Sequence, residues 1–491
     1  GGRRAERLAA DAVPARPRLT SMATRSFLHT PGRIVSPGPG RSRDRLLVAY
    51  GWTIGPLLAG YLFLDKAFAY LHVPGTPLYV GELVLALGIA GLVASTGYLR
   101  IPLRDESLLW VLLLFVLWGA IRTVPGVRAY GIDAVRDSAL WYYSLFALVI
   151  VAAMARSPEI LDRLWSGLAR ISPWLLLWLP LAVVLVPFSA RAPTMPFSDI
   201  SVLSHKSGNA GTAALLVIAG LWLAPRGRSP GRAAWTMLGL LIIALVATQN
   251  RGGLIGTLAG ASVWLSFHHD RLRMLAKAGV VGVIALTLFS LLAVDVPIPG
   301  LQGRSFSTTQ LVNNVLSLTG SADAPGNLSG TVDGRQQLWS RVVERQVNEG
   351  ELVDGAGFGP NLASEVGVYD EGTTKLRNPH NSHLNILARM GVLGFGLWVA
   401  LWAGWYWRLV GAVGRLKRQG LHTRRQTAAL CMTVATTVLV STFFDPQLEG
   451  AQVAALLWTV FGIGVVVTSR SGWFRPAPEA PARFLAEPGS G

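Results

Sequence analysis

The sequence predicts an all-α polytopic membrane protein with about 12 transmembrane helices and one long extracytoplasmic loop. Three observations predict this class. Apolar residues make up 51% of the 491 residues and charged residues only 14%, and the mean hydropathy is +0.43. Apolar runs of about 20 residues, the length at which a helix crosses the hydrocarbon core, recur along most of the chain. Of the polar connectors between them, one is long.

The apolar runs also place the spans and their orientation. Spans are predicted at 46–64, 78–98, 107–121, 140–155, 173–189, 209–224, 233–249, 251–267, 277–294, 381–407, 428–444 and 450–468. Alternate connectors carry most of the Lys and Arg, so the positive-inside rule predicts that both termini are cytoplasmic. The long connector, 295–380, then lies outside the cytoplasm. No nucleotide triphosphate is expected there, so a reaction on that face needs a pre-activated substrate.

The predicted spans divide the chain into five parts. Residues 45–294 hold spans one to nine, 295–380 form a loop domain, and 381–470 hold the last three spans. The basic tail 1–44 is rich in Arg, Pro, Gly and Ser and is predicted to be disordered, with Met22 as the expected initiator and a transit peptide as the alternative. The tail 471–491 is also predicted to be disordered.

Charge and cysteine usage exclude several classes. The net charge of +17 follows the connectors and the tails, as membrane topology requires, so no nucleic acid is predicted as a partner. The single Cys431 lies in an apolar run, so no disulfide framework is expected. His380 and His383 lack an acidic or Cys partner at zinc-site spacing, so no metal site is predicted.

Two polar segments place arginines on the predicted outer face. Arg251 follows Asn250 at the outer end of a span, where its guanidinium could hold phosphate oxygens or reach to lipid headgroups. Arg335 lies at the start of a predicted amphipathic helix over about 334–348, with Asp333 as its N-cap. A cation in a first turn is unfavourable unless an anion is bound there; the alternative is an ordinary solvated side chain.

Two further segments follow in the loop. The run Gly355 to Pro360 could cradle a phosphate, although a tight turn is the favoured interpretation. His380 lies where the loop meets a span, and histidine is the side chain best suited to accept a proton near neutral pH; the alternative is a structural hydrogen bond. His383 is expected to be structural. Possible substrate-binding residues are His205, Lys206, Trp339 and Asn381.

The order of these segments resembles the O-antigen ligase superfamily over about residues 200–400. The motifs that carry the resemblance are NRGG at 250–253, GRQQLW at 334–339, GAGFGP at 355–360, and HN at 380–381 followed by GVLG at 391–394. The resemblance implies a GT-C-like glycosyltransferase of the bacterial plasma membrane, without a metal or other cofactor, facing away from the cytoplasm. The superfamily also contains lipid-linked polysaccharide polymerases.

The resemblance further implies the substrates and the roles of three residues. The donor would be an undecaprenyl-pyrophosphate glycan, and the acceptor a hydroxyl of a glycan, a lipid or a protein. Arg251 and Arg335 would hold the pyrophosphate, and His380 would be the catalytic residue that assists the incoming hydroxyl. The family often has an acidic residue at the position where this chain has Arg389.

Other functions remain open at this stage. A repeat-unit polymerase of the same superfamily differs only in its acceptor. A lipid-linked glycan flippase or transporter would have ionisable residues near the midplane and repeated halves, whereas here Glu82 is the main charge in a predicted span and no repeat is visible. A non-catalytic scaffold would not need Arg251, Arg335 and His380 on one face. The oligomeric state is left open.

Overall fold

The computed structural model describes residues 45–222, 231–268, 328–367 and 377–470, together with residues 291, 296–297, 305–307, 309–311 and 474. All of these belong to one unit, Ser42–Gly491. The predicted tail 1–44, most of 471–491, the predicted span 277–294 and much of the long loop lie outside the described residues.

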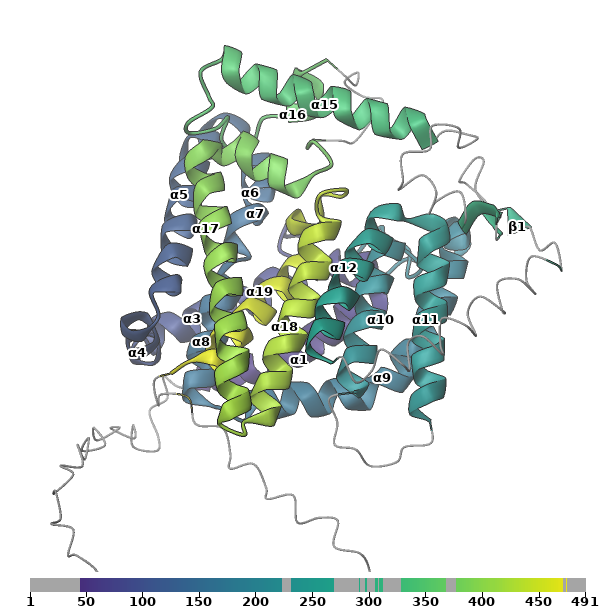
Figure 1. Ribbon diagram of the computed structural model, residues 1–491. Helices are drawn as coiled ribbons and strands as arrows, with labels where there is room; N and C mark the ends of the chain where they lie inside the picture. The colour runs from purple at the N-terminus through teal and green to yellow at the C-terminus, as the bar shows by residue number, and fades with distance from the viewer. Residues whose placement is uncertain are drawn as a thin grey trace, which may run out of the picture. The chain divides into compact units, whose positions relative to one another are not determined.

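Helices dominate the described residues (Figure 1). In chain order they are α1 Arg45–Leu64, α2 Lys66–Ala69, α3 Val80–Ala94, α4 Gly97–Asp105, α5 Ser107–Tyr130, α6 Ile132–Asp137, α7 Ala139–Tyr142, α8 Leu145–Arg156, α9 Ile160–Leu185, η2 Val186–Arg191, α10 Ser207–Leu221, α11 Arg232–Gln249, α12 Arg251–Phe267, α15 Leu328–Asn348, α16 Leu362–Glu365, α17 Ser382–Arg418, α18 His422–Ser441, η5 Gln447–Glu449 and α19 Ala451–Thr468. The strands β1 Val296–Pro297 and β2 Ser305–Phe306 pair antiparallel, Val296 with Phe306.

Each predicted span in the described residues overlaps a helix, but α5, α9 and α17 extend beyond their predicted bounds by about ten residues. By length and composition, five described helices could each cross a membrane, and seven spans result if the bent pairs α3–α4 and α6/α7–α8 each count as one. Shorter apolar helices cover 207–221 and 233–249. The chain is therefore a multi-pass membrane protein. The predicted total of about 12 spans stays a prediction.

Helix ends gather at one end of the described bundle, which we call the His380 end. There α15 and α16 lie across the start of α17 (Figure 1). Hydrogen bonds and close backbone approaches bring the C-terminal ends of α1, α5, α11 and α18 there, with the N-terminal ends of α10, α12, α17 and α19. The end at which α1 begins and α19 finishes is called the opposite end.

A glycine stripe holds α12 against α18. Gly252, Gly256 and Gly260 recur every fourth residue, and a Cβ on any of them would meet Phe444, Ser441 or Thr437 respectively. Small residues at this spacing let two helix backbones approach closely, which is the main way membrane helices gain packing energy. The stripe therefore fixes Arg251, the first residue of α12, beside the end of α18.

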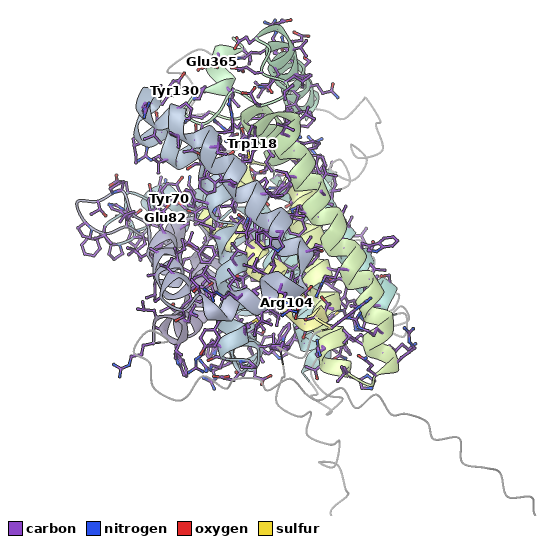
Figure 2. All side chains as sticks on the ribbon, turned by 90° about the vertical axis from the view of Figure 1, so that its left-hand side faces the viewer. Tyr70, Glu82, Arg104, Trp118, Tyr130 and Glu365 are labelled. Atoms are coloured by element: carbon purple, nitrogen blue, oxygen red, sulfur yellow. The ribbon has the colours of Figure 1, made fainter. Side chains whose placement is uncertain are left out.

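A backbone break divides α17. Gly391 has φ 65° and ψ −172°, so the helix bonds around it are interrupted. The loop 351–360 supplies replacements: Ala356 N donates to Ala388 O at 2.8 Å, Gly357 N to Arg389 O at 3.0 Å, and Val392 N to Leu352 O at 2.9 Å. Trp118 of α5 adds a bond from Nε1 to Met390 O at 2.8 Å (Figure 2). Hydrogen bonds from the loop and from α5 thus replace helix bonds that are lost at Gly391.

The glycines of the loop are explained by this contact. Gly355 has φ +83°, and a Cβ there would lie 2.5 Å from Gly391 N. Because the N–H groups of Ala356 and Gly357 bind α17 carbonyls, they are not directed at a ligand. The tight-turn interpretation of Gly355 to Pro360 is therefore correct, and the phosphate cradle is wrong.

Helix α15 differs from its prediction. It begins at Leu328 and not near 334, so Asp333 lies inside the helix and is not its N-cap. Arg335 accordingly lies in the body of α15, and the argument that it occupies a first turn is wrong. Leu338 and Val342 are buried against α16 and Ala388, which seats α15 on the first segment of α17.

Candidate active site

The loop before α17 presents His380 in a constrained conformation. His380 has φ 53°, a left-handed value that few side chains adopt, though histidine is among the more tolerant. Its backbone N donates to Asn378 Oδ1 at 3.1 Å. Trp339 of α15 donates from Nε1 to Pro379 O at 2.7 Å. Two hydrogen bonds therefore fix the loop, one to Asn378 within the loop and one to Trp339 of α15.

A buried carboxylate anchors the same loop. Asn378 Nδ2 donates to Glu449 Oε2 at 2.6 Å, and Asn385 Nδ2 donates to Glu449 Oε1. Burial raises the pKa of Glu449 to about 7, against the lowering effect of Arg389. Glu449, in η5, thus joins the loop to the first segment of α17 on both sides of His380.

His380 itself is poised to act as a base. Its Nδ1 is buried and has no hydrogen-bond partner among the described residues. Burial lowers the pKa of His380, and the positive charge of Arg335 lowers it further. Asp445 acts in the opposite direction and Lys206 adds to the lowering. The imidazole is therefore neutral at pH 7, with a free ring nitrogen.

Lys206 and Asp445 form an ion pair whose two charges act electrostatically on His380. Lys206 Nζ lies 3.0 Å from both carboxylate oxygens of Asp445. Its backbone N donates to Asp65 Oδ2 at 2.6 Å, while Asn209 Nδ2 donates to Asp65 Oδ1 at 2.7 Å. Asp65 is 1% exposed. The buried Asp65 carboxylate therefore fixes the start of α10 and aims Lys206 at Asp445.

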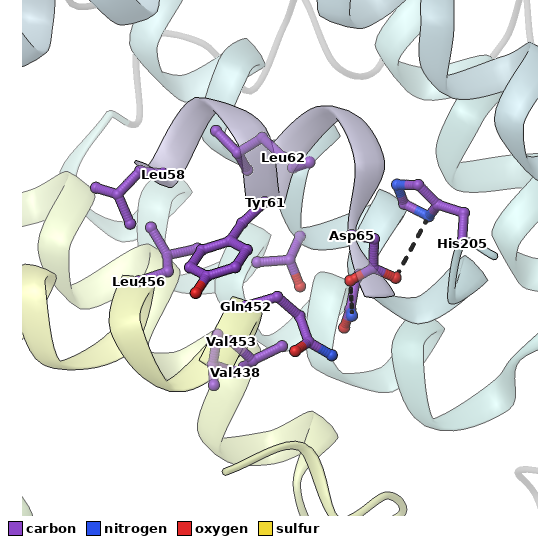
Figure 3. Close-up of a pocket in the computed structure, with 12 residues that line it drawn as sticks. Leu58, Tyr61, Leu62, Asp65, His205, Val438, Gln452, Val453 and Leu456 are labelled. Atoms are coloured by element: carbon purple, nitrogen blue, oxygen red, sulfur yellow. Dashed lines mark hydrogen bonds and ion pairs between the residues drawn. The ribbon is translucent and has the colours of Figure 1, made fainter. Parts of the chain in front are cut away.

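A small cavity with a mixed polar and apolar lining lies beside His205 (Figure 3). It holds about 30 Å³ and is lined by Asp65, His205, Tyr61 and Gln452, among others. His205 Nε2, Tyr61 Oη and Gln452 Oε1 have no hydrogen-bond partner in the described part of the chain. A space of this size with several such groups suits one or two buried waters. His205 thus faces this cavity, with Nδ1 3.7 Å from Asp65 Oδ2.

Arg251 approaches the same region from α12. Asn250 caps the helix by accepting from Gly253 N at 2.8 Å. Gly208 lies against Gly253, so α10 and α12 begin side by side. The neighbouring Gly252 packs on Phe444, the residue before Asp445. Arg251 and Lys206 therefore both stand at helix starts next to the Phe444–Asp445 turn.

The combined electrostatics favour an anion. The N-terminal ends of α10 and α12 lie at the His380 end, and the N-terminus of a helix carries partial positive charge. Lys206, Arg251 and Arg335 add full charges. Such an arrangement binds phosphate groups, and a neutral imidazole beside it can accept a proton.

The remaining predicted residues have structural contacts. Asn381 caps α17, accepting from His383 N and Leu384 N at 3.0 and 3.1 Å. His383 bonds Leu439 O at 2.9 Å through Nε2 and accepts from Trp398 Nε1 at 3.1 Å, so its expected structural role is confirmed. Whether Asn381 and Trp339 also contact substrate stays a prediction.

Arg389, the departure from the family pattern, is explained by a long-range ion pair. Its side chain is 1% exposed, and Nη2 lies 3.0 Å from Asp137 Oδ2 of α6. Arg377 reaches the same oxygen at 3.4 Å. Sequence reasoning did not identify Asp65 or Asp137. The available signal was the position of each carboxylate beside an apolar run, which gives no information about its partner.

Comparison with known proteins agrees with the geometry. Residues 236–399 match the model of the family described as O-antigen ligase. This region contains α11, α12, α15, α16 and the first segment of α17, and therefore Arg251, Arg335 and His380. No curated protein matches the chain. Residues 236–399 of this chain therefore form an O-antigen ligase domain.

Proposed function

We propose that this protein transfers a glycan from an undecaprenyl-pyrophosphate donor to an acceptor hydroxyl at the His380 end, without a metal ion. The observation that carries the proposal is the placement of His380. Its ring nitrogen is buried and unpartnered among the described residues, and Arg335, Lys206 and Asp445 surround it electrostatically.

The proposed reaction follows from these charges. The acceptor oxygen bonds to the anomeric carbon while the bond from that carbon to the pyrophosphate oxygen breaks. His380 takes the proton of the hydroxyl, and the lipid pyrophosphate leaves with the electron pair. A positioned base contributes roughly 10²–10⁴-fold in rate. Arg251, Arg335 and Lys206 stabilise the developing negative charge.

The polymerase alternative uses the same chemistry with a different acceptor. The transporter alternative would place ionisable residues near the midplane. Glu82, the main charge of the predicted spans, lies in the first turn of α3 (Figure 2). It accepts from Tyr79 N at 2.7 Å and from Tyr142 Oη at 2.8 Å, contacts that are structural.

The test is complementation in cells from which the gene has been deleted. Wild type, His380→Gln and Arg335→Gln are compared by gel and mass spectrometry of surface glycan and lipid-linked glycan. Matched controls are His422→Gln, an exposed histidine, and Arg341→Gln, an exposed arginine of the same helix α15. Both site variants are expected to lose transfer while accumulating in the membrane, and both controls to retain it.

The accumulated intermediate identifies the acceptor class. Long lipid-linked chains without attached product indicate a ligase, and single lipid-linked repeats indicate a polymerase. Normal glycan transfer by a well-expressed His380→Gln protein would refute the catalytic proposal and return weight to a flippase or a scaffold.

A further inference from the structure

A large apolar pocket reaches from the opposite end of the bundle toward the cavity near His205, with which it shares Leu58, Leu62 and Leu456 as lining residues. It has a volume of about 490 Å³, within the range of ligand sites. Helices α1, α9, α10, α18 and α19 line it, with Gly55, Leu164, Leu430 and Leu456 among the lining residues. In a membrane protein the surrounding solvent is lipid, so a pocket of this character suits hydrocarbon chains.

Polar atoms at this pocket lack partners. Arg163 Nη1, Trp165 Nε1 and Thr459 Oγ1 are buried and form no hydrogen bond within the described residues. Thr459 is 1% exposed. Each buried, unsatisfied polar group is destabilising, so three around one pocket indicate a ligand with acceptor oxygens.

The positive charge of the pocket lining favours a ligand with a negative charge. Arg163 and Arg170 are the charged residues that line the pocket in the described chain. Arg163 is fixed by Glu159 at 2.9 Å through Nη2 and by the Trp52 ring at 4.2 Å, which leaves Nη1 available. A planar guanidinium is suited to phosphate oxygens, and the Trp165 indole N–H is a second donor in the lining.

We propose that this pocket binds one anionic phospholipid, with its headgroup phosphate at Arg163 and Trp165 and its acyl chains among the apolar side chains. Thr459 Oγ1 donates to an ester carbonyl of the glycerol backbone. A polyprenyl phosphate lacks that ester, and its proposed place is at the other end of the bundle. The lipid therefore has a structural or regulatory role, independent of the proposed transfer reaction.

The test uses the purified, delipidated full chain in detergent with two lipids of identical acyl chains, phosphatidylglycerol and phosphatidylcholine. Native mass spectrometry counts bound lipid, and the melting temperature reports stabilisation. Both lipids present the phosphate, but phosphatidylcholine adds a choline ammonium, which the positive charges of Arg163 and Arg170 repel. Wild type is therefore expected to prefer phosphatidylglycerol by roughly tenfold. Arg163→Gln is expected to lose that preference.

A second variant separates binding from folding. Gly167 lines the pocket, and a Cβ there meets nothing within 4 Å, so Gly167→Leu adds volume without a clash. Replacing a helix glycine also favours the helix. This variant is expected to exclude both lipids while remaining folded. Gly396→Leu is the control, since Gly396 of α17 has equally open surroundings and lies outside the pocket.

Three results would overturn the proposal. They are equal binding of the two lipids by wild type, an unchanged preference in Arg163→Gln, and displacement of phosphatidylglycerol by an equimolar polyprenyl phosphate. None of them depends on transferase activity, so the outcome is distinct from that of the complementation test.

Discussion

At the scale of the residue, His380 combines three properties that rarely occur together. Its backbone has a left-handed φ, its ring is partly buried, and its Nδ1 has no partner in the described chain. Such backbone strain costs about 1–3 kcal/mol and persists where surrounding contacts over-determine it. Asn378, Trp339 and, through Asn378, Glu449 provide those contacts.

The first prediction concerns the pH dependence of transfer. Because the pKa of His380 is lowered by burial and by Arg335, the base is active down to pH values below 6.5 and is lost as the pH falls further. Arg335→Gln removes a positive neighbour and moves this acid limb to higher pH. Asp445→Asn removes a negative neighbour and moves it to lower pH. Both shifts are measured from the initial rates of the residual transfer by each purified variant across pH 4–9. If the two acid limbs move in the same direction, His380 is not the base.

The second prediction concerns Glu449 and stability. Burial raises its folded pKa from an ordinary 4.5 to about 7, so the folded state binds more protons than the unfolded state between these values. Its contribution to stability is therefore full below about pH 4.5 and is lost as the pH rises through 7. Each pKa unit corresponds to about 1.4 kcal/mol. Glu449→Gln is expected to flatten the decline in melting temperature between pH 5 and 8; two parallel curves would refute this.

At the scale of the element, the break at Gly391 makes the start of α17 a short helix of its own. The loop 351–360 and Trp118 satisfy the backbone groups that the break leaves unpaired. As a result, Asn381 and Asn385 belong to a segment that packs against α15 and η5, while the rest of α17 follows the spanning helices. The site is built on the short segment.

The third prediction compares two glycines with positive φ. Gly350→Ala meets open space at φ +72° and is expected to cost about 1–2 kcal/mol for the conformation alone. Gly355→Ala, at φ +83°, also collides with the backbone of α17 and is expected to cost about 3–5 kcal/mol. Melting temperatures in one detergent give the ranking. Equal losses would mean that the loop is not pressed against α17.

Contacts between elements were the part of the structure that the sequence predicted least. Apolar runs predicted the helices because lipid requires continuous apolar segments with all backbone groups bonded internally. His380 and Arg251 were located because each lies where such a run begins. The Lys206–Asp445 pair spans 239 residues, and no local pattern specifies such a partner. The start of α15 was misplaced because Asp333 resembles an N-cap, although the helix continues through it.

At the scale of the whole molecule, Asp137 ties the first half of the chain to the O-antigen ligase domain. Its carboxylate accepts from Gly359 N at 3.2 Å and pairs with Arg377 and Arg389. Helix α6 is thereby joined to the loop, to the segment before His380 and to α17. Residues outside 236–399 therefore help to hold the site.

The fourth prediction tests this connection. Asp137→Asn leaves the buried Arg389 without the carboxylate that contacts it and is expected to cost about 3–5 kcal/mol. The double variant Asp137→Asn, Arg389→Met removes the stranded charge and is expected to recover part of the loss. Arg136→Gln, which breaks an exposed pair at 4.0 Å, is the control and should change stability by under about 0.5 kcal/mol. Melting curves of all four proteins decide; a double variant less stable than Asp137→Asn would contradict the account.

The ion pair between Lys206 and Asp445 also bears on turnover. In the proposed transfer reaction, Asp445 pairs with the ammonium group that a diphosphate would need, so an arriving donor would have to displace an internal competitor. That competition weakens donor binding, but it also weakens the hold on the diphosphate that remains after transfer. When this product departs, the carboxylate recaptures the lysine and the cationic groups are again partly neutralised. Such a site would bind the donor more weakly and release the diphosphate product more rapidly.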